Sequence, residues 1–185
     1  MRSQSAPVRP SFVSLVPMWA VHLSLALVAG IAIGGRASAT GGSVLDAALS
    51  AVFGVTFVWL ALHDAATRII PNRVVYPAAV LALAISWAWD TRGPLDAAAG
   101  GALAFGGIAI LGWCTGGGLG GGDLKMGTLV GLVVGYGALP LAAIVTAVSG
   151  GVVAIALLVS GQVGRGGSIA YAPCIALGGI VALLH

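Results

Sequence analysis

Long apolar runs dominate the chain, separated by short stretches that contain glycine, proline or charged residues. Runs of about 16 to 24 residues recur, a length typical of α-helices that cross the roughly 30 Å hydrocarbon core of a bilayer. The pattern predicts seven such helices, at residues 11–34, 45–63, 74–90, 97–115, 124–138, 139–160 and 169–184. Only Gly137-Ala138-Leu139-Pro140 divides the fifth from the sixth, so this boundary is the least well defined.

The composition also indicates a membrane protein. Hydrophobic residues make up 59% of the chain and charged residues only 7%, whereas a water-soluble domain has about a quarter of its residues charged. We expect an all-α, polytopic transmembrane helical bundle: a six-helix core at 45–185, an extra N-terminal helix at 11–34 and a short cytoplasmic tail at 1–10. Ala37-Ser38-Ala39 imitates a signal-peptide cleavage site. The apolar run before it exceeds the usual signal-peptide length, which favours a retained helix.

The basic residues indicate the orientation of the bundle. With the N-terminus in the cytoplasm, six of the eight basic residues lie on the cytoplasmic side: Arg2, Arg9, Arg68, Arg73, Lys125 and Arg165. Arg36 and Arg92 then lie outside, in agreement with the positive-inside rule. We therefore expect a multi-pass protein of the inner (cytoplasmic) membrane, embedded in the lipid bilayer. Because the charges are scattered through the loops, they do not indicate binding to nucleic acid.

Cysteine and histidine give no sign of a metal or redox centre. Cys114 and Cys174 both fall inside predicted helices and form no CxxC pair, which zinc and thioredoxin-like sites require. The three histidines have no ligand-like spacing. We expect no metal site and no cofactor.

The five acidic residues are all aspartates, and they divide into two groups. Asp46 and Asp96 start predicted helices, where an acid complements the positive end of the helix dipole. Asp90 stands at a water-facing helix end, so all three are interpreted as structural. Asp64 and Asp123 are the only acids on the expected cytoplasmic side, each at a helix end next to turn-forming residues.

Each of these two aspartates has a plain structural alternative. Asp64 is placed to form an exposed i,i+4 ion pair with Arg68, and Asp123 to cap a helix after a glycine-rich turn. Taken together, they also suit hydrolysis, because two neighbouring carboxylates cannot both ionise cheaply. The charged one then deprotonates water while the protonated one polarises a carbonyl. Spacing along the chain does not show that the two meet.

Glycine spacing predicts which way Asp123 faces. Gly127, Gly131 and Gly135 recur at intervals of four in the fifth apolar run, and small residues at this spacing let membrane helices approach closely. Asp123 lies four residues before Gly127 and extends the same stripe. We expect its carboxylate to face a packed neighbour rather than lipid.

These residues together resemble a known family. Asp64 followed by Ile70-Pro71-Asn72, and then Gly120-Gly121-Gly122-Asp123-Leu124-Lys125, are similar to the two motifs of the prepilin peptidases, or type IV leader peptidases. A third similarity is the stretch around Pro173, which precedes Ala176-Leu177-Gly178. The resemblance covers roughly residues 45 to 185 and implies a GxGD-type membrane aspartic protease.

The resemblance also implies roles for single residues. Asp64 and Asp123 would be the catalytic pair, and Gly120 and Gly122 would shape the loop. Lys125 would orient that loop or meet lipid phosphate. The site-shaping set is completed by Pro71 and Asn72, which turn the chain into the third helix, and by Pro173.

The implied enzyme removes short basic leaders from prepilin or pilin-like substrates of type IV pilus and protein secretion systems, at the cytoplasmic membrane face. Larger members also carry an N-terminal region with paired cysteines and methylate the product. Because this chain has neither feature, we expect the peptidase activity without the methyltransferase.

Two other functions remain open at this stage. A small membrane transporter or channel subunit would use Asp64 and Asp123 as ion-relay groups. Both acids stand at helix ends, however, and the chain has no sign of an inverted repeat. A presenilin-like protease also has a GxGD turn but expects a Tyr-Asp pair, where this chain has His63-Asp64.

Overall fold

The computed structural model describes residues 27–35, 43–90, 92–116, 120–161 and 171–185. Within these ranges all regular structure is helical, which confirms the predicted fold class. Residues 27–35 form a helix that overlaps the end of the expected N-terminal segment. The expected tail at 1–10 and the rest of that segment lie outside the described residues.

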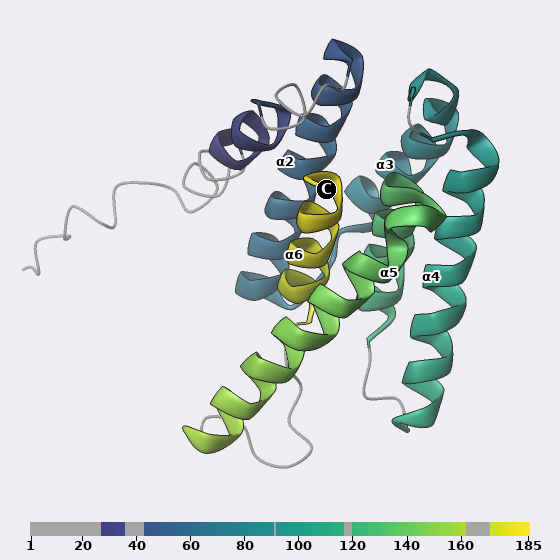
Figure 1. Cartoon of the computed structure of the whole chain (residues 1–185). Helices are drawn as coiled ribbons and strands as arrows, with labels where there is room; N and C mark the ends of the chain where they lie inside the picture. The colour runs from purple at the N-terminus through teal and green to yellow at the C-terminus, as the bar shows by residue number, and fades with distance from the viewer. Residues whose placement is uncertain (1–26, 36–42, 91, 117–119, 162–170) are drawn as a thin grey trace, which may run out of the picture.

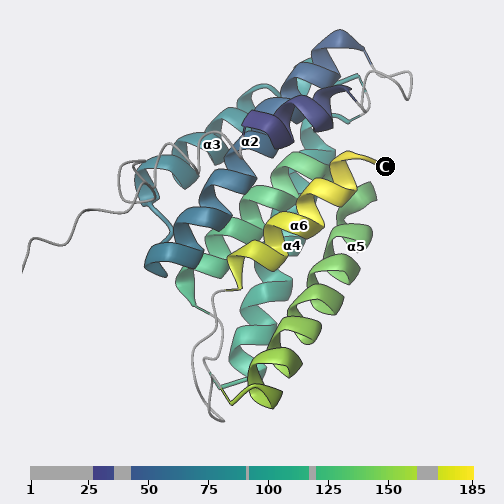
Figure 2. The same ribbon diagram turned by 90° about the vertical axis from the view of Figure 1, so that its left-hand side faces the viewer.

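Five α-helices and one 3₁₀ turn follow (Figure 1). Three helices are long and apolar enough to cross a membrane: α2 (Val44–Thr67), α4 (Pro94–Cys114) and α5 (Gly121–Val159). The shorter elements are α3 (Asn72–Ala84), η2 (Ser86–Ala88) and α6 (Ala172–Leu183). In two perpendicular views α6 lies between α2 and α5 (Figures 1 and 2).

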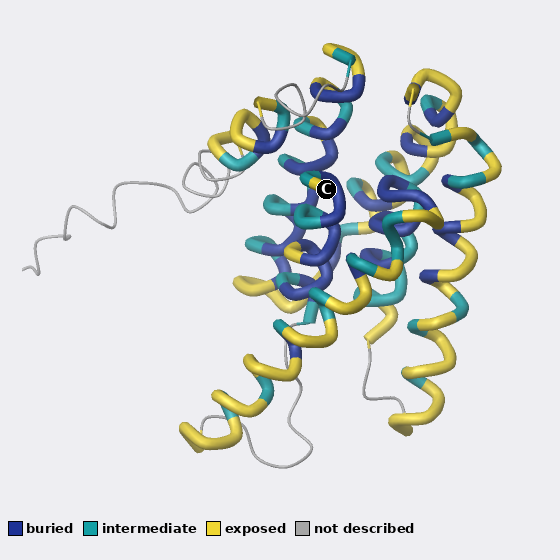
Figure 3. Tube along the Cα trace, in the orientation of Figure 1, coloured by how far each residue is buried: buried dark blue, intermediate teal, exposed yellow. Residues whose placement is uncertain are grey.

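The core lies where α2, α5 and α6 meet, and buried positions gather there (Figure 3). Its largest fully buried apolar side chains come from α2, α3 and α5: Phe53, Phe57, Leu60, Val75, Met126, Leu129 and Val133. Many large apolar side chains on the outer surface are exposed instead, among them Ile110, Ile144 and Ile155. An apolar outer surface is what a bilayer requires of its helices.

The third predicted helix is shorter than expected. The pattern predicted a helix at 74–90, whereas α3 runs from Asn72 to Ala84 and gives way to η2. The hydroxyl of Ser86 donates to the carbonyl oxygen of Leu83 at 2.6 Å. A serine that bonds the nearby backbone in this way competes with helical hydrogen bonds, which accounts for the early end.

The glycine stripe of α5 packs on α4. A Cβ atom added to Gly131 would collide with the backbone of Gly100, and one added to Gly127 would overlap the side chain of Ile108. The two backbones therefore approach as closely as glycine allows. This confirms that the stripe faces a packed helix rather than lipid.

The predicted division between the fifth and sixth helices exists, but it lies at Gly135 rather than between residues 138 and 139. Gly135 has φ 74° and ψ 172°, a conformation that only glycine adopts without strain. The second half of α5 then runs back beside the first (Figure 1). Pro140 lies inside this second half, five residues after the break.

Two charged residues replace the helical hydrogen bonds lost at Gly135. Asp96 Oδ1 accepts a hydrogen bond from the N–H of Tyr136 at 3.0 Å, and the guanidinium of Arg92 donates to the carbonyl oxygen of Val133. Burial lowers the pKa of Arg92, while the charges of Asp46 and Asp96 oppose that change. The break in α5 is thus held by two half-buried charged side chains.

Asp46 completes this cluster. The N–H of Asp46 donates to Ser43 Oγ at 3.1 Å, where Ser43 is the N-cap of α2. Asp46 Oδ1 accepts from the N–H of Asp90 at 3.2 Å. The structural interpretation of Asp46 and Asp96 is therefore confirmed: both carboxylates bond backbone N–H groups.

We call this end of the bundle the clamp end and define it by Asp46, Arg92 and Asp96. The other end, where α2 finishes and α3, α5 and α6 begin, is called the motif end.

Candidate active site

Asp64 lies in the last turn of α2 and is only 6% exposed. The helix stops just beyond it because Arg68 adopts a left-handed conformation, with φ 56°, and donates its N–H to the carbonyl oxygen of Asp64 at 2.7 Å. Although both residues are described, their side chains form no ion pair within salt-bridge distance. The exposed i,i+4 pair that the sequence allowed is therefore wrong, since Asp64 is buried and Arg68 exposed.

The start of α6 lies against the Asp64 carboxylate. The backbone N–H of Ala172, the first residue of α6, acts on that carboxylate as a hydrogen-bond donor. His63 and Arg68 also act electrostatically on it. The His63 ring itself stacks on Trp59, with ring centroids 5.1 Å apart. Asp64 is thus a buried carboxylate with backbone and electrostatic partners.

Asp123 lies in the first turn of α5, after the N-cap residue Gly120. Its Oδ2 accepts a hydrogen bond from the N–H of Gly120 at 3.2 Å, and an acid at this position stabilises the start of a helix. The capping role that the sequence allowed is therefore present, although Gly120 and not Asp123 is the N-cap. This role occupies one carboxylate oxygen and leaves the other available for chemistry.

The two aspartates interact electrostatically. The charge of Asp64 acts on Asp123, and the charge of Asp123 acts in turn on Tyr171. These residues come from α2, from the start of α5 and from the N-cap position of α6. The motif end therefore holds two carboxylates that influence each other, as general acid–base chemistry requires.

The Ile-Pro-Asn turn packs against the glycine-rich turn. A Cβ atom added to Gly122 would lie 3.4 Å from the Ile70 side chain, an ordinary contact distance, so the two turns lie against each other. Lys125 Nζ donates to Asn72 Oδ1 at 2.8 Å and lies 5.5 Å from the centre of the Tyr76 ring. The two motifs are thus joined by a side-chain hydrogen bond.

The two predicted prolines stand at helix starts. Pro71 is the N-cap of α3, and its carbonyl oxygen accepts from the N–H groups of Val74 and Val75 at 3.0 and 3.1 Å. Pro173 is in the first turn of α6, where proline is tolerated because that N–H has no helical partner. Both prolines therefore set where a helix of the motif end begins.

Sequence reasoning missed Tyr171 and Ala172. The last helix was predicted to begin at residue 169, which placed both residues inside it, whereas α6 begins at Ala172. The only local signal is a tyrosine two residues before a proline. Their proximity to the aspartates depends on how α6 packs on α2 and α5, which no local pattern reports.

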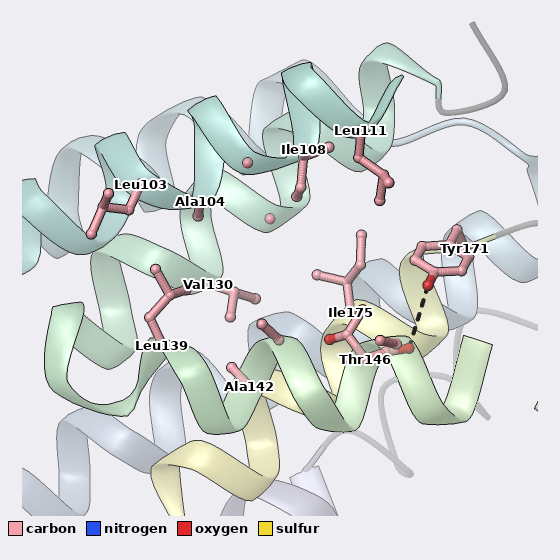
Figure 4. Close-up of a pocket in the computed structure, with 14 residues that line it drawn as sticks. Leu103, Ala104, Ile108, Leu111, Val130, Leu139, Ala142, Thr146, Tyr171 and Ile175 are labelled. Carbon is pink, nitrogen blue, oxygen red and sulfur yellow. Dashed lines mark hydrogen bonds between the residues drawn. The ribbon is translucent and has the colours of Figure 1, made fainter. Parts of the chain in front are cut away.

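An apolar pocket adjoins the motif end (Figure 4). Its volume is about 320 Å³, and it lies between α4, both halves of α5 and the start of α6. Gly127, one turn beyond Asp123, and Tyr171 both line it. Thr146 and Tyr171 supply polar groups on an otherwise apolar wall, and they face each other in the close-up.

Among the described residues, no group of three or more histidine, cysteine or acidic side chains lies close enough to hold a metal ion. The expectation that the protein needs no metal or cofactor stays a prediction.

The fold and site define a class: a helical membrane protein with two interacting carboxylates at one end of its bundle. A family model described as the type IV leader peptidase family matches residues 51–155. The chain belongs to that family. The matched region contains Asp64, Asp123 and the Asn72–Lys125 pair, but not Pro173.

A curated relative is the prepilin leader peptidase/N-methyltransferase of Bacillus subtilis (strain 168). It is 31% identical over 139 residues, which are 72% of this chain and 54% of the relative. The chain therefore spans about half the length of the curated relative that it matches. No solved structure matches the chain.

Proposed function

We propose that the protein is a membrane-embedded aspartic endopeptidase that uses Asp64 and Asp123 as its catalytic pair. The observation that carries the proposal is the electrostatic interaction of these two carboxylates at the motif end. Membership of the type IV leader peptidase family supports the reaction class. The hydrogen bond between Lys125 and Asn72 supports the placement, because it joins the segments that hold each aspartate.

The proposed reaction is general acid–base hydrolysis. The ionised carboxylate of the pair takes a proton from water, and the water oxygen attacks the carbonyl carbon of the scissile peptide bond. The protonated carboxylic acid donates its proton to the carbonyl oxygen, which gives a neutral tetrahedral intermediate. When the C–N bond breaks, the leaving amine takes the proton held by the first carboxylate. The hydroxyl proton of the intermediate returns to the other carboxylate.

The backbone around the pair is compatible with one carboxylate acting as the base and the other as the acid. Each aspartate has a backbone N–H donor, from Ala172 for Asp64 and from Gly120 for Asp123. Such donors favour the ionised form of a carboxylate, while burial and a second carboxylate oppose it. The balance lets the pair share a single proton.

The proposed substrates are prepilin or pilin-like proteins, in which a short basic leader precedes a hydrophobic helix. We infer that the motif end faces the cytoplasm, as the distribution of basic residues favours, and that the enzyme lies in the inner membrane. The apolar pocket beside Gly127 and Tyr171 supports this substrate class, because a hydrophobic segment cut at the pair needs an apolar surface nearby. The absence of methyltransferase activity stays a prediction, checked by the product mass.

The test is processing of a co-expressed prepilin by variants of each aspartate. Asp64→Asn and Asp123→Asn are expected to leave the leader uncleaved. The matched control is Asp90→Asn, which makes the same chemical change at an exposed position of the clamp end and is expected to process normally. Normal processing by Asp64→Asn or Asp123→Asn would reject the proposed pair. Ion uptake into proteoliposomes that either variant abolished would favour a transporter instead.

A further inference from the structure

The first turn of α6 sits beside Asp64, and Tyr171 anchors it from outside the helix. Tyr171 is the N-cap of α6, directly before the Ala172 whose N–H acts on Asp64. Ala172 is completely buried, so it has no room to shift without disturbing its neighbours. The contacts that hold Tyr171 in place therefore also determine the direction of the Ala172 N–H.

The Tyr171 ring rests on a glycine in the second half of α5. A Cβ atom added to Gly150 would collide with Cε2, Cζ and the hydroxyl oxygen of Tyr171. The space beside Gly150 is thus filled by the ring, and alanine would displace it. Gly151 is a natural contrast, because a Cβ added there would meet nothing within 4 Å.

The Tyr171 hydroxyl reaches the same helix one turn earlier. It donates a hydrogen bond to the carbonyl oxygen of Thr146 at 3.4 Å, which the dashed line in Figure 4 marks. Burial raises the pKa of Tyr171, and Cys174 and Asp123 act in the same direction. The hydroxyl therefore keeps its proton at neutral pH and remains a donor. At 3.4 Å this hydrogen bond is weak. The contact of the ring with Gly150 therefore contributes more to keeping Tyr171 in place.

A second contact keeps the rest of α6 on α5. A Cβ atom added to Gly178 would collide with the side chain of Thr146 and the backbone of Ala142. Loss of the Tyr171 contact would therefore release the start of α6 while the body of the helix stays packed. The effect of such a loss should fall on the site rather than on the whole fold.

We propose that Tyr171 is a positioning residue which, seated on Gly150, holds the start of α6 beside Asp64. The inference rests on the proposed function, because it assigns Asp64 to the catalytic pair. Tyr171 acts on the pair through the backbone of Ala172; its ring also lines the apolar pocket, and a contact with substrate there would appear in KM rather than in kcat. When the ring is removed or displaced, the N–H of Ala172 moves away from the carboxylate, and the proton balance of the pair is lost. Catalysis then falls without a matching loss of substrate binding.

The experiment measures kcat and KM of the purified full-length protein, in detergent, on a prepilin-like substrate. Tyr171→Ala and Gly150→Ala are each expected to lower kcat roughly 10- to 100-fold, the scale of a site misplaced by about 1 Å, and to change KM by a much smaller factor. Gly151→Ala is the matched control and is expected to keep the wild-type kcat. Tyr171→Phe retains the ring and is expected to stay within about threefold, since it loses only the weak bond.

The double variant Gly150→Ala/Tyr171→Ala gives the sharpest readout. If both residues act through one contact, its kcat equals that of Tyr171→Ala, because the added Cβ no longer meets a ring. A residue that only stabilised the fold would lower the unfolding temperature and leave kcat per folded molecule unchanged. That result, or a Gly150→Ala protein as active as Gly151→Ala, overturns the inference. A folded wild-type protein that cleaves no prepilin-like substrate would overturn the proposed function instead.

If the Tyr171→Ala protein does not fold, the Gly150→Ala and Tyr171→Phe variants still test the proposal. Gly150→Ala keeps the Tyr171 side chain and changes only the surface of α5 on which its ring packs. A loss of kcat in Gly150→Ala together with retention in Tyr171→Phe supports positioning by the ring. The reverse pattern would overturn it.

Discussion

The two ends of the bundle use carboxylates in opposite ways. At the clamp end, Asp46 and Asp96 each accept a hydrogen bond from a backbone N–H of another segment, and Arg92 covers a free carbonyl oxygen nearby. At the motif end, Asp64 and Asp123 interact with each other, and no lysine or arginine forms an ion pair with either among the described residues. The clamp end has charges of both signs in contact with backbone; the motif end has two acids that influence each other.

The comparison shows why the same residue type is structural in one place and a candidate catalyst in the other. At the clamp end, each carboxylate holds two segments of backbone together. Two carboxylates near each other share their ionisation, because charging one makes charging the other harder. Under the proposed function, such a pair exchanges the proton that hydrolysis needs.

The largest expected effect is a loss of peptidase activity when an aspartate of the motif end is replaced. Asp64→Asn and Asp123→Asn should each lower kcat roughly 10²- to 10⁴-fold, the range for a lost general acid or base, with the folded structure retained. Asn keeps the shape of Asp but cannot exchange the proton. Peptidase assays and thermal unfolding of the same preparations check this. A variant that loses stability in proportion to activity would assign a structural role to that aspartate.

The clamp end should respond in stability rather than in catalysis. Asp96→Ala leaves the N–H of Tyr136 without its acceptor at the break in α5, which should cost about 1–3 kcal/mol of unfolding free energy. Denaturant unfolding in detergent measures this, with Asp90→Ala as the matched control, since the Asp90 carboxylate is exposed. The kcat per folded molecule should stay near the wild-type value. An Asp96→Ala protein as stable as the control would show that Asp96 does not stabilise the break in α5.

A smaller effect is expected at the link between the motifs. Lys125→Met removes the hydrogen bond to Asn72 and should lower kcat roughly tenfold, because a hydrogen bond to a charged group contributes about 1.5–3 kcal/mol. Arg73→Met is the control, as another exposed basic residue of the motif end. A double-mutant cycle with Asn72→Ala isolates the pair. Additive losses would mean that the two residues act separately.

The smallest expected effect concerns the apolar pocket. Gly107 lines it and has open space around its Cα, so Gly107→Leu should fill part of the pocket without a clash. We expect KM for a prepilin-like substrate to rise by about threefold to tenfold, with kcat nearly unchanged. Gly106→Leu makes the same change in equally open space outside the pocket lining. Equal KM values for both variants would remove the pocket from the substrate path.

The fold class could be predicted from the sequence because lipid imposes it. Apolar runs of membrane-crossing length permit little besides helices, and α2, α4 and α5 follow from them. The positions at which helices end or break could not be predicted from the sequence. A helix was expected as far as Asp90, but Ser86 ends it early through a bond to the backbone. The break in α5 lies at Gly135 because Asp96 and Arg92, both remote in sequence, satisfy the backbone there.

The candidate site divides in the same way. Asp64 and Asp123 could be singled out because acids are rare in such a chain. Asn72 and Lys125 were named because they stand in the motifs that resemble a known family. Tyr171 and Gly150 could not, since a tyrosine before a helix and one glycine among thirty carry no local signal. Their roles arise only from the way in which α6 packs against α5.

The hydrogen bond between Asn72 and Lys125 has a consequence for the order of assembly. It closes a loop of more than fifty residues that includes all of α4, and contacts of such long range form late because closing the loop costs chain entropy. The start of α6, which must reach Asp64, is made later still along the chain. A partly inserted molecule therefore already has both aspartates but lacks the groups that frame them. Under the proposed function, the protease would remain inactive until α6 has docked.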